Sequence, residues 1–323
     1  MVETLKKNKM TKQDIYTKIT DIAIKGLEEK GLTWFKTWTS SDGSVEAPMN
    51  HVTGRLYRGM NIFITTSEMT ENEYEHNEWI GFKQAKELGY KIGKGEKGTE
   101  LYIWFVMFYD REKEQWIYKT QFKKLTKNMS EEQIAKRFHQ TMVPKGQYVW
   151  NIAQLDGDIK PKREKKEIVD KTPNEVYDFA ESVYNEMENA PSLRHYGDRA
   201  FYRPSAHHIQ MPKMDDFETS DNYYGVLYHE MIHSTGHESI LNRSGVAGCR
   251  IKFGTTEYSK EELIAEIGSM MLSSIVGLDT GNFNNSKAYI NGWVEYLKNH
   301  KKEIIMASSQ AQKAVDYILG EGK

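Results

Sequence analysis

The segment YHEMIHSTGHES, residues 228–239, restricts the fold of this chain more than any other stretch. His229 and His233 are four residues apart, so on a helix both imidazoles leave one face and can bind the same metal ion. Glu230 would reach a water molecule on that ion and act as a general base. The apolar residues 224–228 that precede the motif are typical of a buried helix beside an active site. The segment therefore predicts a helix-borne hydrolytic metal centre.

A second segment, EELIAEIG (261–268), offers the carboxylate that such a centre needs as its third ligand. Glu262 and Glu266 are four residues apart and share one face of a second helix. We expect one to bind the metal and the other to hold a ligand histidine. Glu262 is favoured as the ligand by analogy with glutamate zincins, and Glu266 is the alternative. Glu261 points away from this face and is expected to be solvated.

Zn²⁺ suits two imidazoles, one carboxylate and an open fourth position, although Mn²⁺ or Ni²⁺ could occupy a similar site. His237 lies eight residues after the first histidine, whereas metzincins place their third histidine ten residues after it, where this chain has Ser239. We expect Gly236 to end the helix. His237 then lies either behind the ligands or near a substrate, or in a solvated loop. His207 and His208 could form the rim of a cleft, but a position at the protein surface is favoured for both.

Composition excludes several classes of protein. Cys249 is the only cysteine, so no intrachain disulfide can form, and the chain suits a reducing compartment. The longest apolar run, residues 101–109, is too short to span a bilayer, and the N-terminal residues lack the apolar core of a signal peptide. We expect a cytoplasmic protein without membrane contact. The net charge is −2, so a nucleic-acid surface would have to come from local clustering of basic residues.

Hydrophobic periodicity predicts an α+β protein. The first half contains a helix over 11–30 that ends at Gly31, and β-like runs over 99–110, 114–122 and 147–155 that predict a small antiparallel sheet. The second half is mostly helical. Residues 156–172 are dense in charge and contain little that could build a core. We expect domains at 1–157 and 173–323 with a charged linker at 158–172; the alternative is a solvated loop within one domain.

The N-terminal half interleaves basic and aromatic residues. Bases stack on aromatic faces and Lys or Arg follow phosphates, a chemistry that suits single strands, whose bases are free to stack. The alternative is that the aromatic residues belong to the core and the lysines to solvated turns. The candidate DNA-binding residues are Trp34, Lys36, Trp38, Arg55, Tyr57, Arg58, Asn61, Lys83, Lys94 and Lys97.

Several segments, in order over nearly the whole chain, resemble the ArdC-type antirestriction proteins of plasmids and other mobile elements. They include TWFKTW, PMNHVTGRLYRGMNIFI, FKQAKELGYKIGKGEKGTELYIW, YVWNIAQLDG, YHEMIHSTGHESILNR and YSKEELIAEIGSMML. The resemblance implies an N-terminal domain that binds single-stranded DNA and a C-terminal zincin-like metallopeptidase domain. It implies protection of incoming DNA from host restriction, with metal ligands at His229, His233 and the EELIAE glutamates and Glu230 as base.

Two other interpretations stay open. The chain could be a zinc metallopeptidase that acts on a specific protein target, such as a host restriction enzyme, with the N-terminal domain as its recognition module. Alternatively, it could be a DNA-binding module whose metal site is only structural, because ligands alone do not show a substrate.

Overall fold

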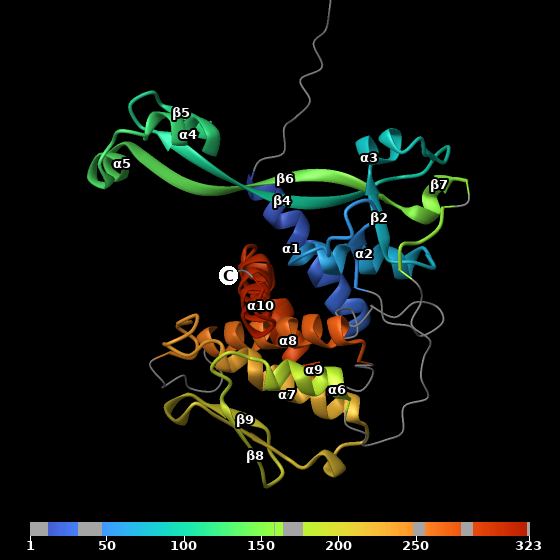
Figure 1. The fold of residues 1–323 in the computed structure, drawn as a ribbon, viewed down its shortest axis with the longest axis vertical. Helices are drawn as coiled ribbons and strands as arrows, with labels where there is room; N and C mark the ends of the chain where they lie inside the picture. Colours follow the sequence, from blue (N-terminus) through green and yellow to red (C-terminus); the bar gives the residue numbers. More distant parts are fainter. Residues whose placement is uncertain are drawn as a thin grey trace, which may run out of the picture.

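A computed structural model describes residues 12–31, 47–157, 159–163, 177–247, 256–278 and 287–321. A long sheet lies above a layer of helices, and a small second sheet lies below that layer (Figure 1). The expected α+β class is confirmed. Trp34, Lys36, Trp38 and Cys249 lie outside the described residues.

The upper sheet has five strands in the order β1-β2-β6-β4-β5. β1 and β2 pair in parallel and the remaining pairs are antiparallel. β4 pairs with β6 along its whole length, from Thr99 opposite Val149 to Asp110 opposite Phe138. The strands are β1 (Met49–Asn50), β2 (Glu78–Gly81), β4 (Thr99–Asp110), β5 (Gln115–Tyr118) and β6 (Phe138–Asn151).

Helices lie near both ends of this sheet (Figure 1). One end carries α2 (Met60–Glu71), α3 (Phe82–Glu87), the paired strands β3 (Lys91–Ile92) and β7 (Leu155–Asp156), and the 3-10 turn η2 (Ile152–Gln154). The other end carries α4 (Lys119–Leu125) and α5 (Glu131–Arg137). The strand expected over 114–122 therefore stops at Tyr118. The residues after it form a helix because Phe122 then stacks on Phe108 of β4, with ring centroids 3.6 Å apart.

The strand expected over 147–155 also differs from the structure. It starts earlier, at Phe138, and ends at Asn151, where the side chain of Asn151 accepts a hydrogen bond from the Ala153 amide and begins η2. The long partner strand β4 supplies hydrogen bonds for these additional residues of β6.

The second half is mostly helical, as expected. Its elements are α6 (Asp178–Asn185), a sheet of β8 (Ser192–His195), β10 (His208–Met211) and β9 (Phe201–Arg203), the turns η3 (Pro204–Ala206) and η4 (Met214–Asp216), then α7 (Ser220–Ser234), α8 (Thr256–Val276), α9 (Lys287–Asn299) and α10 (Glu303–Ile318). α8 packs on both α7 and α10.

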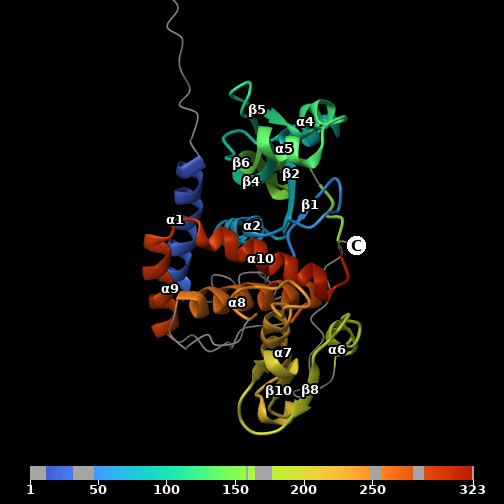
Figure 2. The same ribbon diagram turned by 90° about the vertical axis from the view of Figure 1, so that its left-hand side faces the viewer.

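The N-terminal helix α1 (Lys12–Lys30) packs on the last two helices of the chain, α9 and α10. Gly31 follows it with a φ of 60°, as a helix-ending glycine does. α10 lies between α8 and α2 (Figure 2). One continuous apolar core therefore contains Ile19 and Phe63 from the first half and Tyr228 and Val315 from the second. The boundaries at 157 and 172 stay predictions. Among the described residues, no helix is both long and apolar enough to cross a bilayer.

Candidate metal centre

Helix α7 carries the two histidines, and α8 carries the three glutamates that face them. Thr219 caps α7 by accepting a hydrogen bond from the Asn222 amide. Tyr224 and Tyr228 are fully buried, which confirms the expected apolar approach to the motif. Gly268 of α8 lies against Ile232 of α7, where an added Cβ would lie only 2.6 Å from Ile232 Cδ1. This glycine therefore lets the two helices approach closely enough to bring their polar residues together.

His229, His233 and Glu262 present three potential ligand atoms toward one point. The two Nε2 atoms are 3.1 Å apart. Glu262 Oε2 lies 3.4 Å from His229 Nε2, and Glu262 Oε1 lies 3.6 Å from His233 Nε2. A tetrahedral ion with bonds of 2.0–2.1 Å holds its ligand atoms about 3.3 Å apart. These three residues therefore fit a divalent cation with shifts of only a few tenths of an ångström.

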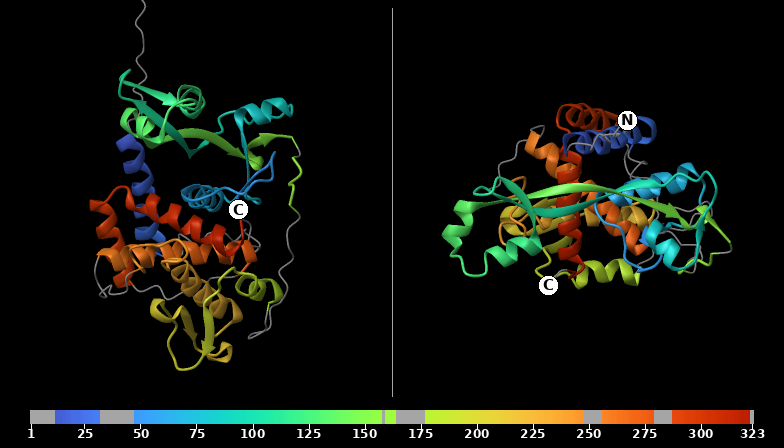
Figure 3. Two further views of the ribbon diagram at one scale, coloured as in Figure 1. Left: turned by 60° about the vertical axis from the view of Figure 1, so that its left-hand side comes forward. Right: turned by 90° about the horizontal axis from the view of Figure 1, so that it is seen from above.

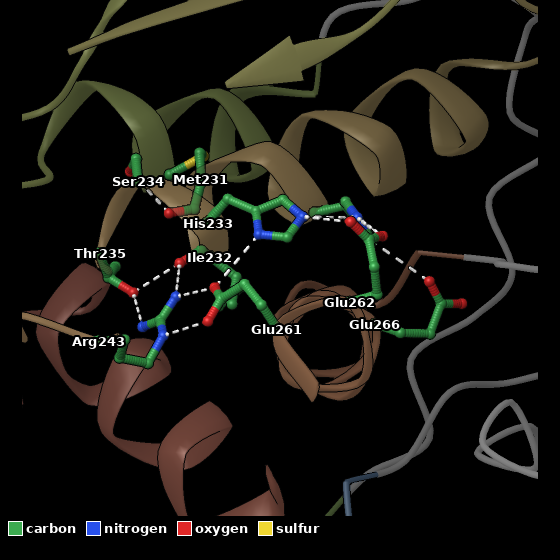
Figure 4. A network of polar contacts seen from close by, with 10 residues as sticks. Met231, Ile232, His233, Ser234, Thr235, Arg243, Glu261, Glu262 and Glu266 are labelled. Atoms are coloured by element: carbon green, nitrogen blue, oxygen red, sulfur yellow. Dashed lines mark hydrogen bonds and ion pairs between the residues drawn. The ribbon is translucent and has the colours of Figure 1, made fainter. Parts of the chain in front are cut away.

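Each histidine also has a carboxylate behind it (Figure 4). Glu266 Oε2 lies 3.4 Å from His229 Nδ1, and Glu261 Oε1 lies 3.2 Å from His233 Nδ1. A proton on Nδ1 that points to a carboxylate leaves the Nε2 lone pair free for a metal, and the contact sets the orientation of the ring. The geometry thus places Glu262 between the histidines and Glu266 behind one of them.

The expectation that Glu261 is solvated is wrong. Its side chain is buried and accepts hydrogen bonds from Arg243 Nε at 3.0 Å and Nη2 at 2.6 Å. Arg243 also donates to Thr235 Oγ1 and to the Ile232 carbonyl, both at 2.7 Å, which ties it to the end of α7 (Figure 4). Helical periodicity shows that Glu261 faces away from Glu262. It does not show that the segment after α7 folds back over that face.

The charges of His229 and Glu262 stabilise each other. Burial favours the neutral form of His229, but Glu262 and Glu266 offset this and hold its pKa well above the usual value. Burial raises the pKa of Glu262, but its contacts with His229 and His233 outweigh burial and lower this pKa to about 2. A positive charge is therefore favoured among these carboxylates, and a bound cation would take the place of the proton.

A cavity of about 500 Å³ opens onto the histidines. Glu230, which is largely buried, lines this cavity with Tyr258 of α8 and with Phe201 and Tyr202 of β9. β9 is an edge strand, because the small sheet has the order β8-β10-β9 in the described part of the chain. The cavity beside the two histidines is thus lined by Glu230, the candidate general base, and by the edge strand β9.

The other histidines are not part of this set. α7 ends at Ser234, close to the expected stop at Gly236. His237 is half-buried, contacts Ser239 Oγ at 2.8 Å and lies beside the His207 ring, with centroids 4.9 Å apart. His208 is not a surface residue as expected: it is buried, with Nδ1 3.0 Å from Ser192 Oγ, because β10 is the central strand of its sheet.

The described DNA-binding candidates fall in two places. Tyr57 packs against the main core, and Asn61 hydrogen-bonds to both the backbone NH and the carbonyl of Tyr102 on β4, so both residues have evident structural contacts. Arg58 is exposed and donates to Asp316 of α10. Arg55 is exposed near Arg58, whereas three exposed lysines lie on α3 and before β4: Lys83, Lys94 and Lys97.

Two family models account for most of the chain. The N-terminal domain of anti-restriction factor ArdC matches residues 13–149, and the zincin-like metallopeptidase family matches residues 180–310. The crystal structure of the metal-free ArdC protein from plasmid R388 aligns over 96% of this chain and 100% of its own, with a TM-score of 0.72 and 27% identity. The chain belongs to the ArdC-type antirestriction family.

Further relatives match nearly the whole chain. The Mn(II)-bound form of R388 ArdC aligns over 95% of this chain and 97% of its own, with a TM-score of 0.69 and 28% identity. Protein y4eC of Sinorhizobium fredii is 27% identical over 98% of this ArdC-type chain and 94% of its own length. A DNA primase TraC of Escherichia coli is 31% identical over 97% of this chain, and a second is 29% identical over 95%. This chain spans only 20% and 27% of those two primases.

Proposed function

We propose that this protein is an antirestriction protein of a mobile element that binds single-stranded DNA and carries a metal-dependent, peptidase-type hydrolytic centre. One observation carries the proposal. A chain whose residues 13–149 match the ArdC N-terminal domain also brings His229, His233 and Glu262 to one point beside a cavity. Protection of incoming DNA from host restriction is the role that this family membership supports.

His229, His233 and Glu262 would hold the metal, which is Zn²⁺ in our proposal. Imidazole and carboxylate ligands also accept Mn²⁺ or Ni²⁺, and the R388 ArdC structure with Mn(II) shows that a relative binds another divalent ion. When bound, such an ion supplies Lewis-acid polarisation of a carbonyl and lowers the pKa of water. Glu261 and Glu266 would keep the ligand rings in position through their Nδ1 atoms.

Glu230 would act as the general base. It follows the first ligand histidine on α7 and lines the cavity, so its carboxylate can take a proton from an attacking water and pass it to the leaving amine. Tyr258 shares the same cavity wall and contacts Glu262. By turning from Glu262 toward a bound substrate, its hydroxyl can donate a hydrogen bond to the substrate's carbonyl oxygen, where negative charge develops.

A peptide substrate is favoured by the position of β9. An extended peptide can add to an exposed sheet edge through backbone hydrogen bonds, and Phe201 and Tyr202 of this edge strand line the cavity. This observation also favours a second candidate function. In it, the protein is a metallopeptidase directed at a specific protein target, such as a host restriction enzyme, and the N-terminal residues serve as the recognition module.

The experiment measures protection and DNA binding in parallel. Unmodified plasmid DNA is introduced into a restricting host that expresses either the wild-type protein, Glu230→Gln or His229→Ala. The full-length proteins are titrated with labelled single-stranded oligonucleotides at several salt concentrations. We expect wild-type protection and binding that weakens steeply with salt. The absence of binding at low salt would refute the proposed function.

Glu230→Gln separates the two candidate functions. It is expected to retain the metal and DNA binding and to lose hydrolysis. If protection is lost with it, hydrolysis is the means of protection. If protection is undiminished, DNA binding suffices and the hydrolytic part of the proposal fails. The full chain is required, because α1 packs on α9 and α10 and a fragment of the first half would expose that shared core.

A further inference from the structure

The end of the upper sheet that carries α4 and α5, residues 103–145, is called the wing here. One face of its strands is not covered by any described helix. We call it the outer wing face, and it consists of four rows of residues paired across strands. Directly paired residues project to the same side of a sheet. The rows are Ile103–Lys145, Phe105–Val143, Tyr118–Met107–Thr141 and Trp116–Tyr109–His139.

The opposite face of the same strands is covered. Phe108, Ile117 and Phe138 alternate with the residues of the outer wing face and are buried in a small core with Phe122 and Ile134 of α4 and α5. Both short helices therefore lie on one side of the wing. Figure 3 shows the β4–β6 ribbon crossing above the main helices and projecting beyond them toward α5. This core accounts for the buried face, and the apolar residues of the outer wing face lie outside it.

Large apolar side chains on the outer wing face are exposed to solvent. Trp116 is 50% exposed and Tyr118 is 61% exposed, and Phe105 and Ile103 on β4 are 38% and 41% exposed. The Tyr109 and Trp116 rings lie side by side with centroids 5.1 Å apart. Contiguous exposed apolar residues on a folded protein commonly mark a binding surface. From Tyr109 to Ile103, six residues along β4, these apolar side chains extend over about 20 Å.

Charge identifies the kind of partner. Residues 103–145, which form the wing, contain nine Lys and Arg against five Asp and Glu, a net charge of +4 in a chain whose total is −2. Lys145 lies within the outer wing face itself, with Nζ 5.9 Å from the centre of the Phe105 ring. Aromatic rings on a sheet, interspersed with cations, match the bases and phosphates of an unpaired nucleic-acid strand. A duplex keeps its bases paired and offers no faces for stacking.

We propose that the outer wing face is the platform on which the bases of single-stranded DNA stack. Trp116, Tyr118 and Phe105 provide the stacking surfaces, and Lys145 follows the phosphates. The net positive charge of the wing attracts the strand to this part of the protein. The proposal rests on the proposed function, because it locates the single-strand binding attributed to the protein. It places the contacts on β4, β5 and β6, away from the candidates Arg55, Arg58, Lys83, Lys94 and Lys97.

The test compares two variants of the full-length protein. In the first, Trp116→Ala and Tyr118→Ala are combined; in the second, Phe179→Ala removes an equally exposed aromatic ring, 53% exposed, from α6. Binding of a fluorescent oligo-dT is measured by anisotropy. Loss of one stacked base corresponds to about a 5- to 140-fold weaker affinity. We expect the double variant to weaken binding at least tenfold and Phe179→Ala to leave it unchanged.

A second measurement does not depend on folding of a variant. The wild-type protein is photocrosslinked to an oligonucleotide that contains 5-iododeoxyuridine, and crosslinked tryptic peptides are identified by mass spectrometry. We expect crosslinks in residues 114–119, the tryptic peptide that contains Trp116 and Tyr118.

A third measurement tests the phosphate contact. Lys145→Gln should reduce the salt dependence of binding by about one phosphate contact.

The outcomes separate this inference from the proposed function. If the wild-type protein does not bind the oligonucleotide, the proposed function fails. If it binds, but the double variant binds equally well and crosslinks lie elsewhere, the platform is refuted and the function stands. If the double variant binds DNA normally but changes from a dimer to a monomer in light scattering, the outer wing face is an interface between two copies, and the platform is again refuted.

Discussion

Arg243 and Glu261 form a buried ion pair directly behind the His233 ring. Two hydrogen bonds join them, with donor–acceptor distances of 3.0 and 2.6 Å. The same carboxylate oxygen that accepts from Arg243 Nη2 lies 3.2 Å from His233 Nδ1. Burial alone would raise the pKa of Glu261, but His233 and Arg243 keep it below its usual value, so the group stays ionised. The orientation of His233, a proposed ligand, thus depends on Arg243, which lies 18 positions before the glutamate that contacts the ring.

Glu261→Gln is expected to weaken metal binding about 10- to 100-fold, because His233 loses the anionic acceptor that orients its ring. The measurement is titration calorimetry with Zn²⁺ and with Mn²⁺. The matched control is Glu257→Gln, an exposed glutamate on the same helix, which should leave the affinity unchanged. Equal affinity in Glu261→Gln and the wild type would show that this carboxylate does not act on the metal site.

Glu262→Gln and Glu266→Gln are expected to differ in severity. Glu262 lies 3.4 and 3.6 Å from the two Nε2 atoms, so its loss removes a ligand. Glu266 lies 3.4 Å from His229 Nδ1, so its loss removes only ring orientation and should weaken metal binding about 10- to 100-fold. Metal content after dialysis is the readout. A Glu266 variant that retains less metal than the Glu262 variant would reverse the assignment of the third ligand.

Asp110→Asn is expected to loosen the wing at neutral pH and to have no effect in strong acid. Hydrogen bonds from Arg137 hold the pKa of Asp110 below its usual value despite burial. A lowered folded-state pKa adds stability above the unfolded-state pKa, near 3.8, and this stability is lost as pH falls through the lower folded value. Hydrogen exchange of β5 amides is the measurement. A difference between wild type and variant that persists below the folded-state pKa would contradict this origin.

Gly268→Ala and Gly292→Ala are expected to change stability in opposite directions. A Cβ at Gly268 would lie 2.6 Å from Ile232 Cδ1, so the two helices must separate, at a cost of about 1–3 kcal/mol. Gly292 is exposed on α9 with nothing within 4 Å of an added Cβ, so alanine should stabilise its helix by roughly 0.5–1 kcal/mol. Urea unfolding measures both. Stabilisation by Gly268→Ala would show that this helix contact is not tight.

Local patterns in the sequence determined those parts of the structure that depend on neighbours a few residues away. The four-residue spacing of His229 and His233 places both rings on one helix face whatever surrounds the helix, and the run at 99–110 forms a strand as expected. The helix over 11–30 and its end at Gly31 follow in the same way. The role of Glu262 between the histidines was an expectation that the geometry favours.

Tertiary structure decided what depends on segments that are distant in the sequence. Residues 119–122 form a helix because Phe122 finds Phe108 as its partner, and His208 is buried because its strand is central in its sheet. Glu261 is buried because Arg243 folds back onto α8, and no periodicity within that helix contains this information. The same reason applies to the outer wing face. Alternation predicts that a strand has two sides, but only the placement of α4 and α5 decides which side stays exposed.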